Sequence, residues 1–131
     1  MSKPFRVQAA LVVLAVFLLS GVAIAPAVAQ EKKGEKGPVR AQKVLVDNDR
    51  VRVTESVWKP GEVNPMIQRG YRVTRVLKGS TTILRTHADG KTETIEWKEG
   101  GVYVSTPDNA SSKNMGKSEV VTYTVVLKPE K

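Results

Sequence analysis

The side chains that most often carry out catalysis or bind metals are scarce in this sequence of 131 residues. It contains one histidine, His87, and no cysteine. Without thiols, neither a disulfide framework nor a cysteine-based zinc site is possible, and one imidazole cannot supply the two or three histidines of most catalytic metal sites. His87 lies beside a predicted turn, where a solvated residue at a strand end is the ordinary interpretation. We therefore expect no metal and no cofactor.

Acid–base chemistry would have to use a carboxylate or a phenol instead. The candidate bases are Glu55, Glu62, Tyr71 and Tyr103, and each has an ordinary alternative as a surface or packing residue. The aromatic side chains also have two interpretations, because they can line a ligand cavity or fill the core of a small domain or a dimer face. These aromatic residues are Trp58, Tyr71, Trp97, Tyr103 and Tyr123.

The first 29 residues have the pattern of a secretory signal peptide. A positively charged start precedes an apolar run over residues 9–20, and Ala27-Val28-Ala29 is a small-x-small cleavage site. A membrane anchor is the alternative, because residues 8–29 are long enough to cross a bilayer. The cleavage triplet favours removal, which predicts a mature chain that starts at Gln30 and has no stable membrane insertion. Its expected location is the bacterial periplasm or the medium.

Positive charge remains once this segment is set aside. The formal charge of the chain is +8, and without Lys3 and Arg6 it is +6, of which Gln30–Gln42 carries +2 and residues 43–131 carry +4. Residues 30–38 include no large apolar side chain, so Gln30–Gln42 is predicted to be a flexible charged leader. The remaining body is long enough for one core. Its charge suits envelope polyanions or acidic lipids, but no recognition helix or interleaved aromatics indicate nucleic-acid binding.

The body is predicted to form strand after strand, because it shows no sustained helical period. The hairpin signal is strongest at Asp89-Gly90, and we expect Leu84 to lie opposite Ile95 on a buried face. Many short antiparallel strands would leave exposed edges in an open sheet, so the sequence predicts an all-β jelly roll or small barrel. The expected strands are residues 43–47, 50–58, 71–78, 81–86, 92–97, 102–105 and 119–128.

The order and spacing of the turns resemble those of the small single-domain cupins over almost all of residues 43–128. The resemblance implies a cupin-type jelly-roll barrel, the double-stranded β-helix, over residues 43–131. It rests on the run Val44–Val53 followed by Lys59-Pro60-Gly61-Glu62, Pro65-Met66, Val76-Leu77-Lys78-Gly79, Asp89-Gly90-Lys91, Glu99-Gly100-Gly101-Val102 and Pro107.

The positions that hold metal ligands in the two cupin motifs have other residue types here. The first motif places Ile67, Arg69 and Arg72 at three ligand positions, and the second places Ser111 or Ser112 at the fourth. Isoleucine cannot coordinate a metal, and a guanidinium is a permanent cation without a lone pair to offer. The metal chemistry of the family is therefore not expected to carry over to this chain.

If the family's backbone is kept, Arg69 and Arg72 put positive charge at the mouth of the barrel. Converging guanidiniums in a partly dry site bind carboxylate or phosphate through charge-assisted, bidentate hydrogen bonds. The opposing interpretation is that residues 66–70 are a surface loop whose arginines face water, and that Arg72 meets Glu55 or Glu62. The predicted ligand-binding residues are Arg69, Arg72, Thr74, Tyr103, Ser105, Ser112 and Asn114.

These observations favour an exported, metal-free, cupin-like binding or interaction module without catalytic activity. Its expected partners are a small anionic molecule in the barrel and a second copy of the chain, which would pair through edge strands and outer apolar positions such as Val73 and Leu77. The alternative is a metal-independent cupin-type enzyme that acts on a small molecule or carbohydrate. A third interpretation is an envelope-surface binder that uses the basic leader and the charge of the body.

Overall fold

The computed structural model describes residues 34–131, so the predicted signal peptide and the first residues of the leader lie outside the described part of the chain. Within that part the regular structure consists of strands, and no helix is present that would be long and apolar enough to cross a membrane. The strands are β1 (Ala41–Asp47), β2 (Val51–Trp58), β3 (Val63–Arg69), β4 (Arg72–Lys78), β5 (Thr81–His87), β6 (Thr92–Trp97), β7 (Val102–Ser105), β8 (Asp108–Asn114) and β9 (Val120–Leu127).

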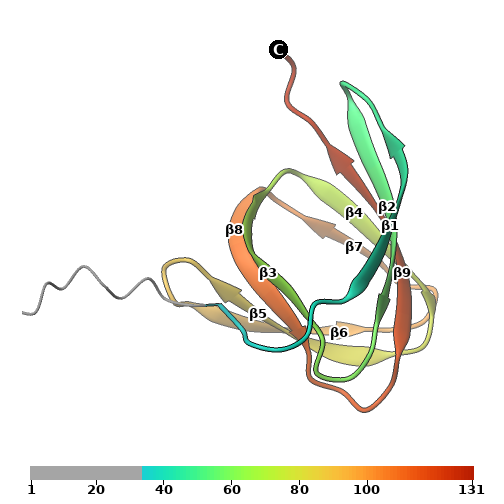
Figure 1. The fold of residues 1–131 in the computed structure, drawn as a ribbon, viewed down its shortest axis with the longest axis vertical. Coiled ribbons are helices and arrows are strands. Elements are labelled where there is room, and N and C mark those ends of the chain that lie inside the picture. The colour runs from blue at the N-terminus through green and yellow to red at the C-terminus, as the bar shows by residue number, and fades with distance from the viewer. Residues whose placement is uncertain (1–33) are drawn as a thin grey trace, which may run out of the picture. The chain divides into compact units, whose positions relative to one another are not determined.

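The strands form two antiparallel sheets that face each other (Figure 1). One sheet has the order β1-β2-β9-β4-β7 and the other has the order β3-β8-β5-β6. Strands that are distant in the sequence, such as β2 and β9, are neighbours, as in a jelly roll. The prediction of an all-β jelly-roll barrel is confirmed, and the seven strands expected from the sequence match observed strands to within two residues at each end.

Two strands, β3 and β8, were not predicted. The interpretation of residues 66–70 as a surface loop is wrong, because Ile67 and Arg69 lie in β3 and pair with Ala110 and Asp108 of β8. The pairing of β3 with β8 shifts register between Asn64 and Ile67. This irregularity accommodates Pro65, which has no N–H to donate to a neighbouring strand. β8 has few of the residue types that favour strands, and it is held in place by hydrogen-bonded pairing to β3 on one side and β5 on the other.

The hairpin between β5 and β6 forms with a different register from the one expected. Ile83 lies opposite Ile95, and Leu84 lies opposite Thr94. The loop is one residue longer than a two-residue turn, because the His87 N–H donates to Lys91 O (2.8 Å) and Gly90 takes a φ of 90°. This three-residue loop with a left-handed glycine shifts the pairing by one position. Ile83 is therefore the fully buried residue, and Leu84 is only half-buried.

The apolar core fills one end of the barrel. Trp58 of β2 and Trp97 of β6 pack edge to face with ring centroids 5.5 Å apart, and Val76, Ile83 and Val120 are fully buried against them. On the same inward faces, nearer the other end, the strands carry polar side chains instead. The interior is thus divided into an apolar layer at one end and a polar chamber at the other.

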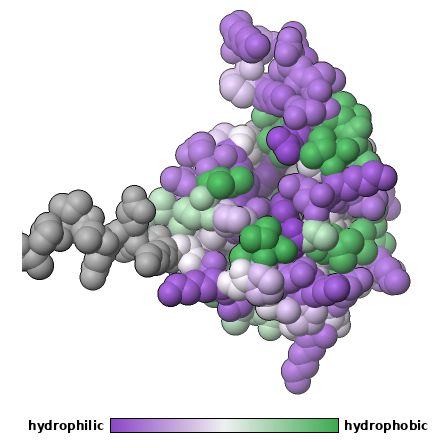
Figure 2. Space-filling view, in the orientation of Figure 1, coloured by the Kyte–Doolittle hydropathy of each residue, from purple (hydrophilic) through white to green (hydrophobic). Residues whose placement is uncertain are grey.

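The outward face of the larger sheet carries many apolar side chains. Its central feature is a row of five valines, one from each strand of the sheet. Each valine in the row is the register partner of the valine on the neighbouring strand. Figure 2 shows green apolar side chains at the surface over β1 and β2. The predicted outer positions Val73 and Leu77 both lie on β4, and Leu77 is 44% exposed. The valine row consists of Val46, Val53, Val125, Val73 and Val104.

The segment before β1 is bound to the barrel from Gly34 onward. Pro38 O accepts a hydrogen bond from the Val63 N–H (2.8 Å), and the Arg40 N–H donates to Val63 O (3.0 Å). The Glu35 N–H donates to Ser111 Oγ (2.9 Å). Backbone pairing therefore fixes the described part of the predicted flexible leader, although this segment buries little apolar surface, and the leader's last two residues already belong to β1.

Candidate functional site

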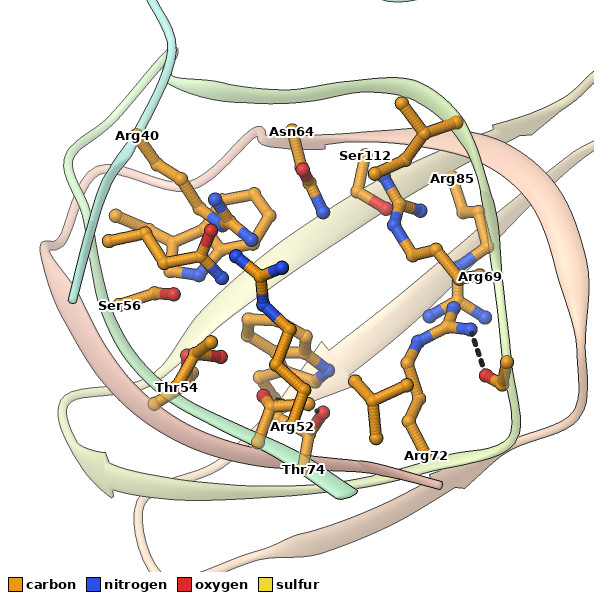
Figure 3. A pocket seen from close by; sticks show the side chains of 18 of the residues that line it. Arg40, Arg52, Thr54, Ser56, Asn64, Arg69, Arg72, Thr74, Arg85 and Ser112 are labelled. Atoms are coloured by element: carbon orange, nitrogen blue, oxygen red, sulfur yellow. Dashed lines mark hydrogen bonds between the residues drawn. The ribbon is translucent and has the colours of Figure 1, made fainter. Parts of the chain in front are cut away.

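A cavity of about 320 Å³ occupies the polar end of the barrel, between the two sheets (Figure 3). Its wall contains five arginines, two tryptophans, several hydroxyl side chains and three side-chain amides, but no aspartate, glutamate or histidine. The polar side chains of the lining are therefore hydrogen-bond donors or groups that can donate, and Ile67 and Val126 are among the apolar ones. The five arginines are Arg40, Arg52, Arg69, Arg72 and Arg85.

The alternation of side chains along β2, β9 and β4 arranges the wall in layers. At the mouth, Arg52 and Arg72 flank Val126, which is the register partner of both. The next layer inward consists of hydroxyl groups, and two of them, Thr74 Oγ1 and Thr124 Oγ1, are 3.1 Å apart. The layer below it combines the hydroxyls of Ser56 and Thr122 with the buried Val76, where the apolar core begins. A ligand that enters this chamber would thus pass a cationic rim before it meets the hydroxyl layer, which is formed by Thr54, Thr124 and Thr74.

Arg72 and Asp108 form a buried ion pair at the side of the cavity. Arg72 Nη1 and Nη2 donate to the two carboxylate oxygens of Asp108, each at 3.0 Å. Burial alone would raise the pKa of Asp108, but the hydrogen bond and charge of Arg72, with the charges of Arg85 and Arg69, hold that pKa below its usual value. The prediction that Arg72 meets Glu55 or Glu62 is wrong, because its partner comes from the unpredicted strand β8.

Arg85 is compensated in a similar way. Its Nη1 lies 3.1 Å from Glu93 Oε1 and 3.9 Å from Asp108 Oδ2. The same Glu93 oxygen is 3.2 Å from His87 Nε2, so the histidine is hydrogen-bonded beside this ion pair and is not among the residues that line the cavity. Its position at the end of β5, with a side chain 30% exposed, agrees with the interpretation of a strand-end residue.

Arg40 and Arg69 are the two cavity arginines that form no ion pair within residues 34–131. The Arg40 guanidinium lies over the Trp58 ring, 4.8 Å from its centroid, and burial lowers its pKa to about 10. Arg69 Nη2 donates to Pro65 O (2.8 Å). Burial, followed by the charge of Arg72, lowers the pKa of Arg69 to about 10. Both cations are therefore held where water stabilises them poorly.

The Asn64 amide provides a further neutral contact to Arg69. With its oxygen oriented toward the guanidinium, it accepts hydrogen bonds from Arg69 Nη2 (2.9 Å) and Nε (3.2 Å). Together with the Pro65 carbonyl, these bonds fix the side chain of Arg69 without neutralising it. The charge of Arg69 consequently stays available to the cavity.

Four buried donor atoms in the described residues have no hydrogen-bond acceptor, and all four belong to residues that line this cavity. A buried donor without an acceptor is unfavourable by about 1–3 kcal/mol, so native proteins contain few of them. Their concentration at one site, with no unpaired buried acceptor beside them, marks a place that is suited to an acceptor-rich ligand. These atoms are Arg40 Nε, Trp58 Nε1, Arg85 Nε and Trp97 Nε1.

Four of the seven residues predicted to bind a ligand line the cavity, namely Arg69, Arg72, Thr74 and Ser112. The other three do not. Tyr103 packs on Trp97 (6.4 Å between centroids), and its hydroxyl oxygen accepts from the Lys98 N–H (2.7 Å). Ser105 lies 3.5 Å from Arg85 Nη2, outside the lining. Asn114 is fully buried, and its amide donates to Trp58 O and Ser118 O, so it holds the barrel end together.

Sequence reasoning missed three of the cavity arginines. Arg52 and Arg85 alternate with outward-facing residues on β2 and β5, so a hairpin register based on Ile83 would have indicated that Arg85 points inward. Arg40 lies in the segment that was expected to be flexible, and no pattern in its neighbourhood predicts that it reaches the barrel. The candidate bases Glu55, Glu62, Tyr71 and Tyr103 are all absent from the lining.

The donor set of the cavity does not fit a transition metal. Residues 34–131 contain no group of three or more histidine, aspartate or glutamate side chains that could hold a metal ion. Of the residues that the sequence resemblance assigned to ligand positions, Ile67, Arg69, Arg72 and Ser112 line the cavity, and Ser111 does not. Guanidinium groups in that position would repel a divalent cation.

Comparison with known proteins shows which solved structures have a similar architecture. No protein-family model matches the sequence, and neither does any curated protein. Among solved structures, a cupin domain from Bordetella pertussis is 23% identical, with a TM-score of 0.62 over 73% of this chain and 100% of that one. A cupin superfamily protein from Desulfitobacterium hafniense is 14% identical, with a TM-score of 0.55 over 72% and 82%.

A recombinant oxalate oxidase in complex with glycolate is also similar, with 18% identity and a TM-score of 0.51 over 66% of this chain and 49% of that one. At these identities the similarity concerns the fold. It agrees with the order of turns in the sequence and with the two facing sheets. The described part of this chain is therefore a small domain with the cupin fold, the double-stranded β-helix.

Proposed function

We propose that this domain is a binding module that holds a small anionic molecule in the polar chamber of its barrel. The observation that carries the proposal is the set of four buried, unpaired donors on Arg40, Trp58, Arg85 and Trp97, all in one cavity without a lining carboxylate. A carboxylate or phosphate supplies several acceptor oxygens at once, and its charge matches the guanidiniums around it.

Electrostatics support the same conclusion. The chamber holds Arg40 and Arg69 as partly buried cations without a carboxylate partner, and their lowered pKa values reflect the unfavourable desolvation of both charges. An anion bound between them would recover part of that free energy. Electrostatic attraction between its charge and the cationic rim would also speed its entry.

A binding role is preferred to catalysis because of where the candidate bases lie. Glu62 accepts a hydrogen bond from the Lys59 N–H (2.8 Å) in the turn after β2, and Glu55 is on the outward face of β2, opposite Lys43 and Tyr123. Neither reaches the chamber, and Tyr71 and Tyr103 also lie outside its wall. An acid–base mechanism requires a group within hydrogen-bond reach of the substrate.

The proposal includes export and operation without a metal. The signal-like pattern of residues 1–29 supports a location outside the cytoplasm, and the cationic donor set supports the absence of a resident metal. Recovery of the protein in the periplasmic or medium fraction with Gln30 as its first residue would support the export part. A cytoplasmic protein with an intact first segment would contradict it.

The binding proposal can be tested with the protein's own fluorescence, because its two tryptophans both line the chamber. Acetate, succinate, sulfate and inorganic phosphate would be titrated into the purified protein while fluorescence and the two indole ¹H–¹⁵N resonances are recorded. We expect saturable changes with at least one of these anions. Saturation must weaken in Arg69→Gln and persist in the matched control Arg75→Gln, which changes an exposed arginine on β4 outside the chamber. Unchanged fluorescence and indole resonances with all four anions would overturn the proposal.

A further inference from the structure

We propose that the ligand of this chamber carries two separate negative groups, one bound on the Arg40 side and the other on the Arg69 side. The inference rests on the proposed anion-binding function and specifies the class of ligand: a small two-ended acid, such as a dicarboxylate. It follows from the charge balance of the chamber, from the placement of its arginines and from the nature of the wall between them.

The charge balance leaves two buried cations. Arg72 is neutralised by the two-bond pair with Asp108, and Arg85 by Glu93 with Asp108 nearby. Arg52 has a side chain that is 46% exposed and lies 3.6 Å from Asp47, so water and this carboxylate both stabilise it. The remaining two, Arg40 and Arg69, form no ion pair in the part of the chain that the structure describes, and both are partly buried, although the charge of Asp108 also acts on Arg69.

The two cations are on opposite sides of the chamber. Figure 3 shows Arg40 on one side and Arg69 with Arg72 and Arg85 on the other, with Asn64, Ser112 and the half-exposed Arg52 between them. Arg40 comes from the segment before β1, and Arg69 is the last residue of β3. The charge of Arg40 acts on Arg69 and is one cause of its lowered pKa, so the two cations repel each other across the chamber, and a ligand with a negative group near each of them would relieve this repulsion.

Apart from Arg52, which is half-exposed and lies near Asp47, the wall between the two sides is neutral. It consists of the hydroxyl layer around Thr74 and Thr124, with Trp58 and Trp97 at the base. Hydroxyls suit a polar substituent, and ring faces suit a short carbon chain. A short carbon chain with an acid group at each end thus matches the chamber, because one acid group can lie at Arg40, the other at Arg69, and the chain can lie along the hydroxyl layer.

The test compares ligands of equal length that differ by one charge. Succinate, glutarate and adipate would each be titrated against the corresponding monomethyl ester, with the two indole signals as the readout. The best dicarboxylate should bind at least about tenfold more tightly than its monoester, which is the factor expected for one more charge-assisted contact. Arg40→Gln and Arg69→Gln should each reduce this ratio to within about threefold of unity, and Arg75→Gln should keep it.

A second variant tests the role of Arg69 without removing its side chain, so that a loss of folding is not mistaken for a loss of binding. Asn64→Asp keeps the shape of the side chain and places a carboxylate on Arg69. It should remain folded and lose the preference for the dicarboxylate over the monoester. Retention of that preference in Asn64→Asp would overturn the assignment of Arg69 as the second binding point.

The possible failures are distinguishable. If diacids and monoesters bind equally well, the two-group inference is wrong, while the anion-binding function stands. If inorganic phosphate binds more tightly than every dicarboxylate, the cations act on one compact group and the inference is again wrong. If no anion changes the indole signals, both this inference and the proposed function are overturned.

Discussion

Arg72 of β4 and Asp108 of β8 form a two-bond ion pair that connects the two sheets of the barrel. Their side chains are only 7% and 10% exposed, so solvent screens the pair weakly. The pair is a structural support of the chamber: it ties the sheets together at the rim and neutralises one guanidinium in advance. This leaves the unpaired arginines to bind the ligand.

Loss of Asp108 should therefore destabilise the fold strongly. Asp108→Ala removes one partner and leaves Arg72 as a buried, uncompensated charge, which is expected to lower the free energy of unfolding by about 3–5 kcal/mol. Urea denaturation followed by tryptophan fluorescence measures the change. Asp49→Ala at an exposed turn is the matched control and should change stability by less than about 0.5 kcal/mol. Equal effects of the two variants would contradict the structural role of the pair.

The pair also makes stability depend on pH in a defined direction. Because the pKa of Asp108 is lowered in the folded protein, its stabilisation is fully present above the unfolded value of about 4 and is lost as the pH falls through the lower folded value. The difference in unfolding free energy between the parent protein and Asp108→Ala should be largest at pH 7 and shrink toward pH 2.5. A difference that does not vary with pH would mean that the carboxylate is not preferentially ionised in the fold.

Asn64→Asp should raise stability and lower ligand affinity at the same time. A carboxylate at this position converts two neutral hydrogen bonds to Arg69 into charge-assisted ones, which is expected to add about 1 kcal/mol to the free energy of unfolding. The same carboxylate competes with an anionic ligand for Arg69. Thermal unfolding and anion titration of one preparation give both values. A variant that gains stability without losing affinity would place Arg69 outside the binding site.

The same substitution, valine to threonine, tests at two positions which side chains point into the barrel and which point outward. Val76→Thr puts a hydroxyl into the fully buried apolar layer, where it should lower stability by about 1–3 kcal/mol. Val104→Thr changes a residue that is 59% exposed on the outer valine row, and its effect should stay within about 0.5 kcal/mol. Chemical denaturation of the two variants measures both effects. The reverse order would mean that the strands present the opposite faces inward.

The sequence was informative where local patterns determine the structure. Valine-rich runs bounded by glycine and proline turns indicated most of the strands, and the order of turns pointed to the cupin fold. β3 and β8 escaped prediction because their residues favour strands weakly, so that pairing with neighbouring strands decides their conformation. The register of the β5–β6 hairpin was missed by one position, since it depends on how Gly90 closes the loop.

Only part of the site could be predicted from the sequence, because the position of its other residues also depends on pairing between segments. Resemblance to the family's motif positions led to Arg69, Arg72 and Ser112, which do line the cavity. It could not lead to Arg40, because this residue reaches the chamber through backbone bonds between its segment and Val63, and no periodic pattern encodes them. Asp108 was also missed, since its role depends on the pairing of β8 with β3.

The valine row on the outside and the polar layers on the inside have a consequence for folding. Sliding β2 by one position past β9 would turn its valines inward and Arg52, Thr54 and Ser56 outward, but it would also remove Trp58 from the apolar core. Correct assembly must accordingly be enforced at the closed end, where Trp58 and Val120 are themselves register partners. The aromatic base of this barrel thus acts as the anchor against which its strands are aligned.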